Sequence, residues 1–233
     1  MLVIFFILFL SHLIADFYLQ CDSFCRAKEE KGFRSWQVYV HALIVWGCAW
    51  IMLPHITFWY GALILGVSHF LMDGIKHYMR KWKWVFFVDQ LFHMAMITLV
   101  AYLYQDQSTE MLACWNWNMK YVVYALGFLL ICKPTNVLIQ NIFRIFDLQL
   151  SEAAQKASPS LLQAGHVIGI AERIMAFLFV LVNQYEALGF LIAAKSILRF
   201  GDRETARTEY VLVGTLLSFL IAVLTAVGIE WLI

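Results

Sequence analysis

Long apolar runs that carry histidine and aspartate are the feature that most limits how this chain can fold. The first run covers residues 1–20, which is about the length that an α-helix needs to cross the hydrocarbon core of a bilayer. Of the 233 residues, 62% are hydrophobic and 14% are charged, whereas an average soluble domain has roughly 25% charged residues. The sequence therefore predicts an all-α fold, a polytopic bundle of transmembrane helices with little chain left for a water-soluble domain.

Further apolar runs follow, separated by polar connections. They cover residues 36–53, 57–77, 84–104, 119–132, 165–200 and 208–233. The run at 165–200 is unusually long and is interrupted by polar residues at 183–186, so we expect the chain to turn back there. Residues 187–200 would then reach only ~21 Å at 1.5 Å per residue, as a short tilted helix or a re-entrant one. The prediction is about seven spans plus this half-span.

The runs also predict how the chain is divided. We expect a four-helix core in residues 1–104, an external loop and fifth helix in 105–134, a cytoplasmic amphipathic linker in 135–160, and a C-terminal helical membrane region in 161–233. Pro134 is expected to stop the fifth helix, because proline lacks the backbone N–H that a helix needs. Glu172 and Arg173 are expected to form an internal ion pair or to line a polar cavity.

Lysine and arginine are concentrated in alternate connections. They cluster after the first, third and fifth helices and again from Lys195 to Arg207, while residues 105–117 contain none. Basic residues in short loops favour the cytoplasmic side, so we expect the N-terminus outside. The sequence has neither a basic tract nor a glycine-rich phosphate loop, so we expect no nucleic-acid partner.

Seven histidine and aspartate residues in the first four runs share one level of the predicted membrane. They are His12, Asp16, His41, His69, Asp73, Asp89 and His93. Their positions along helices of alternating direction place all seven in the cytoplasmic third, and pairs four residues apart lie on one helix face. Helices joined by short connections usually pack as neighbours, so we expect these side chains to meet.

Imidazole and carboxylate groups at this spacing indicate a metal site. They are ligands of zinc, which is expected first, and of manganese and iron. Seven candidates exceed one tetrahedral set, so either two metals are bridged or some residues orient the ligands. The alternative is a buried hydrogen-bonded network without metal. For Lys76 and His77 we expect contact with lipid head groups rather than catalysis.

Several of these segments resemble the bacterial membrane family called Domain of Unknown Function 3307. They are residues 11–20, His41, 69–76, 89–93 and, in longer members, 189–202. The resemblance implies the bacterial inner (cytoplasmic) membrane. More loosely, the ridge of His69 and Asp73 is similar to that of membrane-bound metal-dependent hydrolases, and the helix-borne histidines and aspartates look like those of the seven-helix ceramidase and progestin-receptor group.

These observations predict an integral-membrane metal-dependent hydrolase that acts on a lipid or lipid-linked substrate at the cytoplasmic leaflet. His41, Asp73 and Asp89 are the candidate catalytic residues. Two alternatives stay open, namely a transporter of metal ions or protons, supported by the break near residue 183, and a non-catalytic membrane partner or sensor with a structural metal. Membrane lipids are the expected partners, and the sequence leaves the oligomeric state open.

Overall fold

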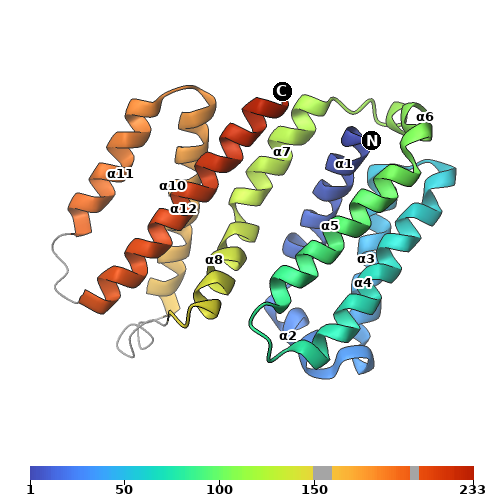
Figure 1. Ribbon diagram of the computed structural model, residues 1–233, viewed down its shortest axis with the longest axis horizontal. Coiled ribbons are helices and arrows are strands. Elements are labelled where there is room, and N and C mark those ends of the chain that lie inside the picture. Colours follow the sequence, from blue (N-terminus) through green and yellow to red (C-terminus); the bar gives the residue numbers. More distant parts are fainter. Residues whose placement is uncertain (149–158, 200–204) are drawn as a thin grey trace. The chain divides into compact units, whose positions relative to one another are not determined.

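A computed structural model describes residues 1–148, 159–199 and 205–233, and this part of the chain is built from helices (Figure 1). No strand occurs among the described residues, which confirms the all-α prediction. The chain divides into two compact units, Met1–Leu126 and Gly127–Ile233. Each unit is described by itself.

Four long helices make up most of the first unit. They are α1 (Leu2–Leu13), α3 (Trp36–Met52), α4 (Trp59–Met79) and α5 (Val85–Leu103). Both α1 and α4 pack against α3 and α5, so the four helices surround a common interior. Ile7, Leu65 and Ile97 are buried there, whereas Leu43 and Leu91 are exposed on outward faces. Large apolar side chains on both the inner and the outer faces are typical of helices that contact lipid.

Shorter elements connect these helices. They are the π-helical turn η1 (Ile14–Tyr18), α2 (Asp22–Lys31), the 3₁₀ turns η2 (Gly32–Arg34), η3 (Ile56–Phe58) and η4 (Gln105–Gln107), and α6 (Ser108–Ala113). The segment after the first span, expected to be a polar loop, is therefore a helix. The chain makes about a right-angled bend before this helix, since Leu2–Tyr18 and Asp22–Arg34 are bent by 89°.

Two glycines let η2 lie directly on α4. Gly32 has a φ of +53°, which glycine adopts without a steric penalty. On α4, a Cβ added at Gly74 would lie 2.1 Å from Cε1 of Phe33, so the Phe33 ring fills the space that a larger residue would need. This close contact fixes the end of α2 against α4.

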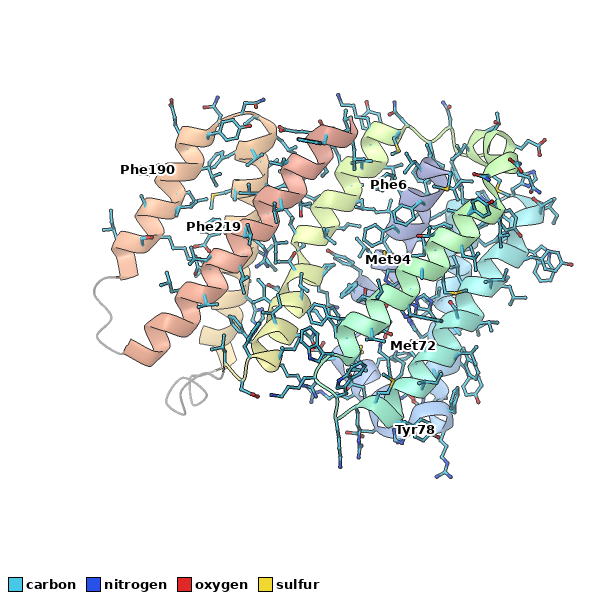
Figure 2. All side chains as sticks on the ribbon, viewed as in Figure 1. Phe6, Met72, Tyr78, Met94, Phe190 and Phe219 are labelled. Carbon is cyan, nitrogen blue, oxygen red and sulfur yellow. The ribbon has the colours of Figure 1, made fainter. Side chains whose placement is uncertain are left out.

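The second unit contains the remaining helices. They are the end of α7 (Met119–Ile131), α8 (Lys133–Ile145), α10 (Pro159–Leu181), α11 (Tyr185–Arg199) and α12 (Thr205–Leu232). α10 packs against both α11 and α12, and α8 packs against α12. Phe219 of α12, labelled in Figure 2, forms a buried cluster with Ala176 and Ala222, while Phe190 of α11 is exposed.

Two breaks interrupt the helices of the second unit. Pro134 lies in the first turn of α8, so the chain bends by 44° between α7 and α8 and then continues as a helix. The fifth helix thus ends before Pro134, as expected, and a new helix starts there; residues 149–158 of the expected linker lie outside the described part. The second break separates α10 from α11, where Asn183 has a φ of +56°. It coincides with the polar residues that predicted a turn.

Arg173 and Glu172 turn to different partners. Arg173 Nε donates to the carbonyl oxygen of Ile131 at 2.7 Å, and its other nitrogens donate to Asn136 Oδ1 at 2.6 Å and Ser218 Oγ at 3.1 Å. Glu172 forms an ion pair with Lys195 of α11. The internal pair expected between Glu172 and Arg173 is thus replaced, because Arg173 satisfies a backbone carbonyl freed at the α7–α8 break.

Several of the described helices are suited to a membrane. Ile56–Met79, Val85–Leu103 and Leu212–Leu232 are long and apolar enough to cross one, which gives three candidate spans, or up to five if each bent pair is one span. The sequence predicted about seven. The number is lower because α3 has only 17 residues, two further segments are bent and α10 is not among the candidate spans.

Candidate metal centre

The first unit brings all seven predicted site residues into one network. His12 lies in the last turn of α1, Asp16 in η1, His41 in α3, His69 and Asp73 in α4, and Asp89 and His93 in α5. All except Asp16 are buried, and the Asp16 side chain is 12% exposed. The seven side chains therefore meet within one unit, while their depth in a membrane stays a prediction.

The π-helical turn directs Asp16 into this network. Its defining hydrogen bond runs from the Leu19 N–H to the carbonyl oxygen of Ile14, five residues back, at 3.0 Å. Such widened turns occur often at functional sites. Here Asp16 Oδ1 lies 3.2 Å from His41 Nε2 and 3.4 Å from His69 Nε2.

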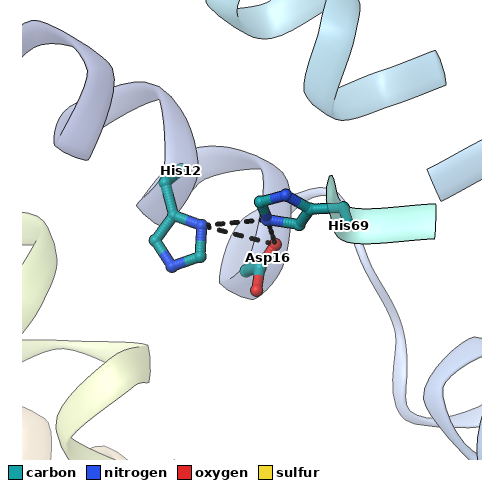
Figure 3. A group of neighbouring side chains, drawn as sticks. All are labelled: His12, Asp16 and His69. Carbon is teal, nitrogen blue, oxygen red and sulfur yellow. Dashed lines mark hydrogen bonds and ion pairs between the residues drawn. The ribbon is translucent and has the colours of Figure 1, made fainter. Parts of the chain in front are cut away.

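Three side-chain atoms converge at the centre of the site. His12 Nδ1, Asp16 Oδ1 and His69 Nε2 all lie within 4.8 Å of one another, and we call these residues the converging trio. Figure 3 shows both histidines turned toward Asp16, with His12 Nδ1 3.2 Å from His69 Nε2 and 3.8 Å from Asp16 Oδ1. The trio combines residues from α1, η1 and α4.

Hydrogen bonds outside the trio indicate where the ring protons are. His69 Nδ1 lies 3.0 Å from the carbonyl oxygen of Leu65 and can only donate to it, so Nε2 of a neutral His69 is bare. Gln90 Nε2 donates to Asp89 Oδ2 at 3.1 Å, which turns Gln90 Oε1 toward His12 Nε2 at 3.2 Å. His12 must therefore donate from Nε2, and its Nδ1 is bare as well.

With both histidines neutral, three electron-pair acceptors therefore face one another with no proton between them. Asp16 Oδ1 is also buried without a hydrogen bond. Bringing unpaired acceptors together in a buried site is costly, and a cation bound between them would remove that cost. Two imidazole nitrogens and a carboxylate oxygen are a usual ligand set for zinc, and each of the two histidines is held in orientation by a hydrogen bond from its other ring nitrogen.

Asp73 and Asp89 face ammonium groups instead. Lys28 Nζ lies 2.6 Å from Asp73 Oδ2, and Lys76 Nζ lies 2.8 Å from Asp89 Oδ2 and 3.5 Å from Asp73 Oδ1. His93 Nε2 is 3.1 Å from Asp89 Oδ1. These carboxylates therefore already have positive partners and lie outside the converging trio.

His41 connects the trio to Asp73. Its Nε2 lies 3.2 Å from Asp16 Oδ1 and 3.8 Å from Asp73 Oδ2, and both ring nitrogens lie near Gln20 Nε2, with Nδ1 at 2.8 Å and Nε2 at 3.0 Å. His41 is thus placed to orient Asp16 or to exchange a proton beside it.

The lysines and glutamines of the site were not among its predicted residues. Lys28 belongs to the segment expected to be a loop, and it reaches Asp73 because α2 turns back onto α4. Lys76 was expected at the lipid head groups, but it lies between two buried carboxylates with its side chain 24% exposed. Its neighbour His77 donates from Nδ1 to the carbonyl oxygen of Glu29 at 2.8 Å, which adds a further contact between α2 and α4. The spacing of Gln20 four residues after Asp16 was the one available signal.

Comparison with known proteins identifies the family. No curated protein and no solved structure matches the chain. The family described as "Protein of unknown function (DUF3307)" matches residues 4–123, which is over half of the chain and includes all seven site residues. The chain therefore belongs to the DUF3307 family.

Proposed function

We propose that the first unit binds one divalent transition-metal ion between His12, Asp16 and His69, with zinc first and manganese or iron as the other candidates. The observation that supports this most is the convergence of three side-chain atoms that are all acceptors when both histidines are neutral. The proposal narrows the seven candidate ligands to three. Asp73, Asp89 and His93 then serve as charged or orienting neighbours of the site.

We further propose that the metal serves hydrolysis of a lipid or lipid-linked ester, amide or phosphoester. Three protein ligands leave a fourth position for water or substrate, as in catalytic zinc sites. A bound divalent ion lowers the pKa of water and polarises the bond to be cleaved. His41, next to Asp16 and Asp73, is the proposed proton acceptor. The apolar outer faces of the helices support a substrate that arrives from the membrane.

The proposed setting is the bacterial inner membrane with the N-terminus outside. The connections that carry Arg26 and Arg80 would lie in the cytoplasm, close to the leaflet that supplies the substrate. The three candidate spans, the two bent pairs, and the helices α3 and α10 would together make about seven spans if all of them cross the membrane. The helix α11 would then be the half-span.

Elemental analysis of the purified protein tests the metal site. Wild-type protein reloaded with zinc and freed of excess metal should retain about one ion per chain. His69→Gln and Asp16→Asn should retain far less, whereas the matched control His55→Gln should equal wild type, because His55 contacts Thr57 in a loop. Folded wild-type protein that retains no zinc, manganese or iron would refute the proposal.

Transport is the second candidate, and the two bent helix pairs support it, because discontinuous helices line the sites of many transporters. Metal-loaded protein in phospholipid vesicles can be assayed with chromogenic carboxylic esters and phosphodiesters and, in parallel, for uptake of zinc. We expect cleavage in wild type and in His55→Gln, and its loss in His41→Gln with the metal retained. Zinc uptake without cleavage would favour transport, and neither activity would favour a structural or sensor role.

A further inference from the structure

Three other side chains of the site, Asp73, Asp89 and His93, are arranged in a pattern like that of the converging trio. We call them the second half of the site. In the trio, one helix and its π turn supply a histidine and an aspartate four residues apart, and α4 adds a histidine. In the other half, α5 supplies Asp89 and His93, also four residues apart, and α4 adds Asp73, one turn after its contribution to the trio. Pairs at this spacing can bind one ion from a single rigid helix.

The two halves differ in what lies between the side chains. In the second half the ammonium group of Lys76 lies 2.8 Å from Asp89 Oδ2 and 3.5 Å from Asp73 Oδ1. Two further polar atoms there, Asp89 Oδ1 and His93 Nδ1, are buried without a hydrogen bond. The second half thus has metal-ligating groups with unused capacity around an internal cation.

We propose that the second half is a divalent-metal site in which Lys76 takes the place of the ion, so that the centre holds one metal instead of two. This inference rests on the proposed function, because it assumes that the converging trio binds the first ion. Among the described residues, three carboxylates and two ammonium groups belong to the site, which leaves one net negative charge with neutral histidines.

Charge balance explains why a single lysine has this effect. One divalent ion in the trio turns the net charge of the wild-type site to one positive, so a second divalent ion would be repelled in a buried setting. Without Lys76 the same site with one ion is neutral. Asp73 and Asp89 would also lose the group that holds them apart, and they could close around a second ion together with His93.

Lys76→Met is the substitution that tests this inference, because methionine keeps the aliphatic stem and removes the ammonium group. After removal of metal, reloading with excess zinc and gel filtration in detergent, wild type should retain about one ion per chain and Lys76→Met about two, a twofold rise. Lys76→Arg, which keeps the charge, and Lys81→Met, which removes an exposed charge from the same connection, should both stay at one. Adding Asp89→Asn to Lys76→Met should return the content to one.

The outcomes separate the two proposals. Wild type without metal contradicts the proposed function itself. If wild type and Lys76→Met both retain one ion, the inference about the second site is contradicted and the proposed function is not. Two ions in wild type would also contradict this inference. If Lys76→Met does not purify as a folded protein, judged by its thermal transition, Lys76→Gln replaces it under the same criteria.

Discussion

Replacing Lys28 of α2 with methionine should lower the stability of the first unit, because it removes the ammonium group that pairs with the buried carboxylate of Asp73 on α4. The Lys28 and Asp73 side chains are 8% and 3% exposed, and their charged atoms are 2.6 Å apart. Removing one partner of a buried pair typically costs about 3–5 kcal/mol. We expect about 3 kcal/mol, near the lower end, because Lys76 Nζ at 3.5 Å still faces the same carboxylate.

A double-mutant cycle separates this pair from general damage. Asp73→Asn removes the charge and keeps the volume, so the double variant Lys28→Met/Asp73→Asn should cost less than the sum of the single variants. Thermal unfolding in detergent can be followed by tryptophan fluorescence. At roughly 2–4 °C per kcal/mol for a chain of this size, Lys28→Met should lower the midpoint by roughly 6–12 °C. Lys31→Met, an exposed residue of the same helix, is the matched control and should change it little.

The cycle also has a result that would refute the reasoning. If the two single effects add within about 0.5 kcal/mol, Lys28 and Asp73 are not coupled in the folded protein. That result would contradict the packing of α2 against α4, because this packing brings the two side chains together.

Three further predictions concern other parts of the chain. On a background without native cysteines, a cysteine in place of Lys31 should react with a membrane-impermeant reagent only after permeabilisation, whereas a cysteine in place of Glu110 should react in intact cells. The opposite pattern would contradict the proposed orientation. Gly74→Ala should lower the unfolding midpoint, because its Cβ would lie 2.1 Å from Phe33 Cε1, and adding Phe33→Ala should relieve that clash. Arg173→Met should cost about 3 kcal/mol by leaving backbone and side-chain acceptors unpaired, and Arg173→Lys should rescue only part of it, because one ammonium group cannot reach all of them.

Apolar runs predicted the long helices, but they did not predict α2. The long helices follow from runs of apolar residues, and the meeting of the seven residues follows from helix direction and the four-residue spacing. The segment after Gln20 is polar, so by composition it reads as a loop. Its helix is held by contacts distant in sequence, such as Lys28 with Asp73, 45 residues away. Such contacts leave no local signal.

The sequence also did not predict that the seven residues divide into two groups. Asp16 and Asp73 both lie four residues after a histidine, which makes them equivalent in a regular helix. The π turn in η1 changes the direction of Asp16, and Lys28 and Lys76 engage Asp73. The distinction therefore depends on a local change of helix geometry and on which lysines fold inward.

The balance of buried polar groups indicates which unit carries the chemistry. In the second unit, Arg173 has four acceptors and Glu172 pairs with Lys195, so these charges are satisfied by the fold itself. Among the described residues, the buried side-chain atoms that lack a hydrogen bond all lie in the first unit, and all but Trp46 Nε1 belong to the metal centre. Unsatisfied buried groups persist only where something else compensates for them. Substitutions at Arg173 should therefore alter stability, whereas conservative substitutions in the converging trio should alter metal binding while the fold survives.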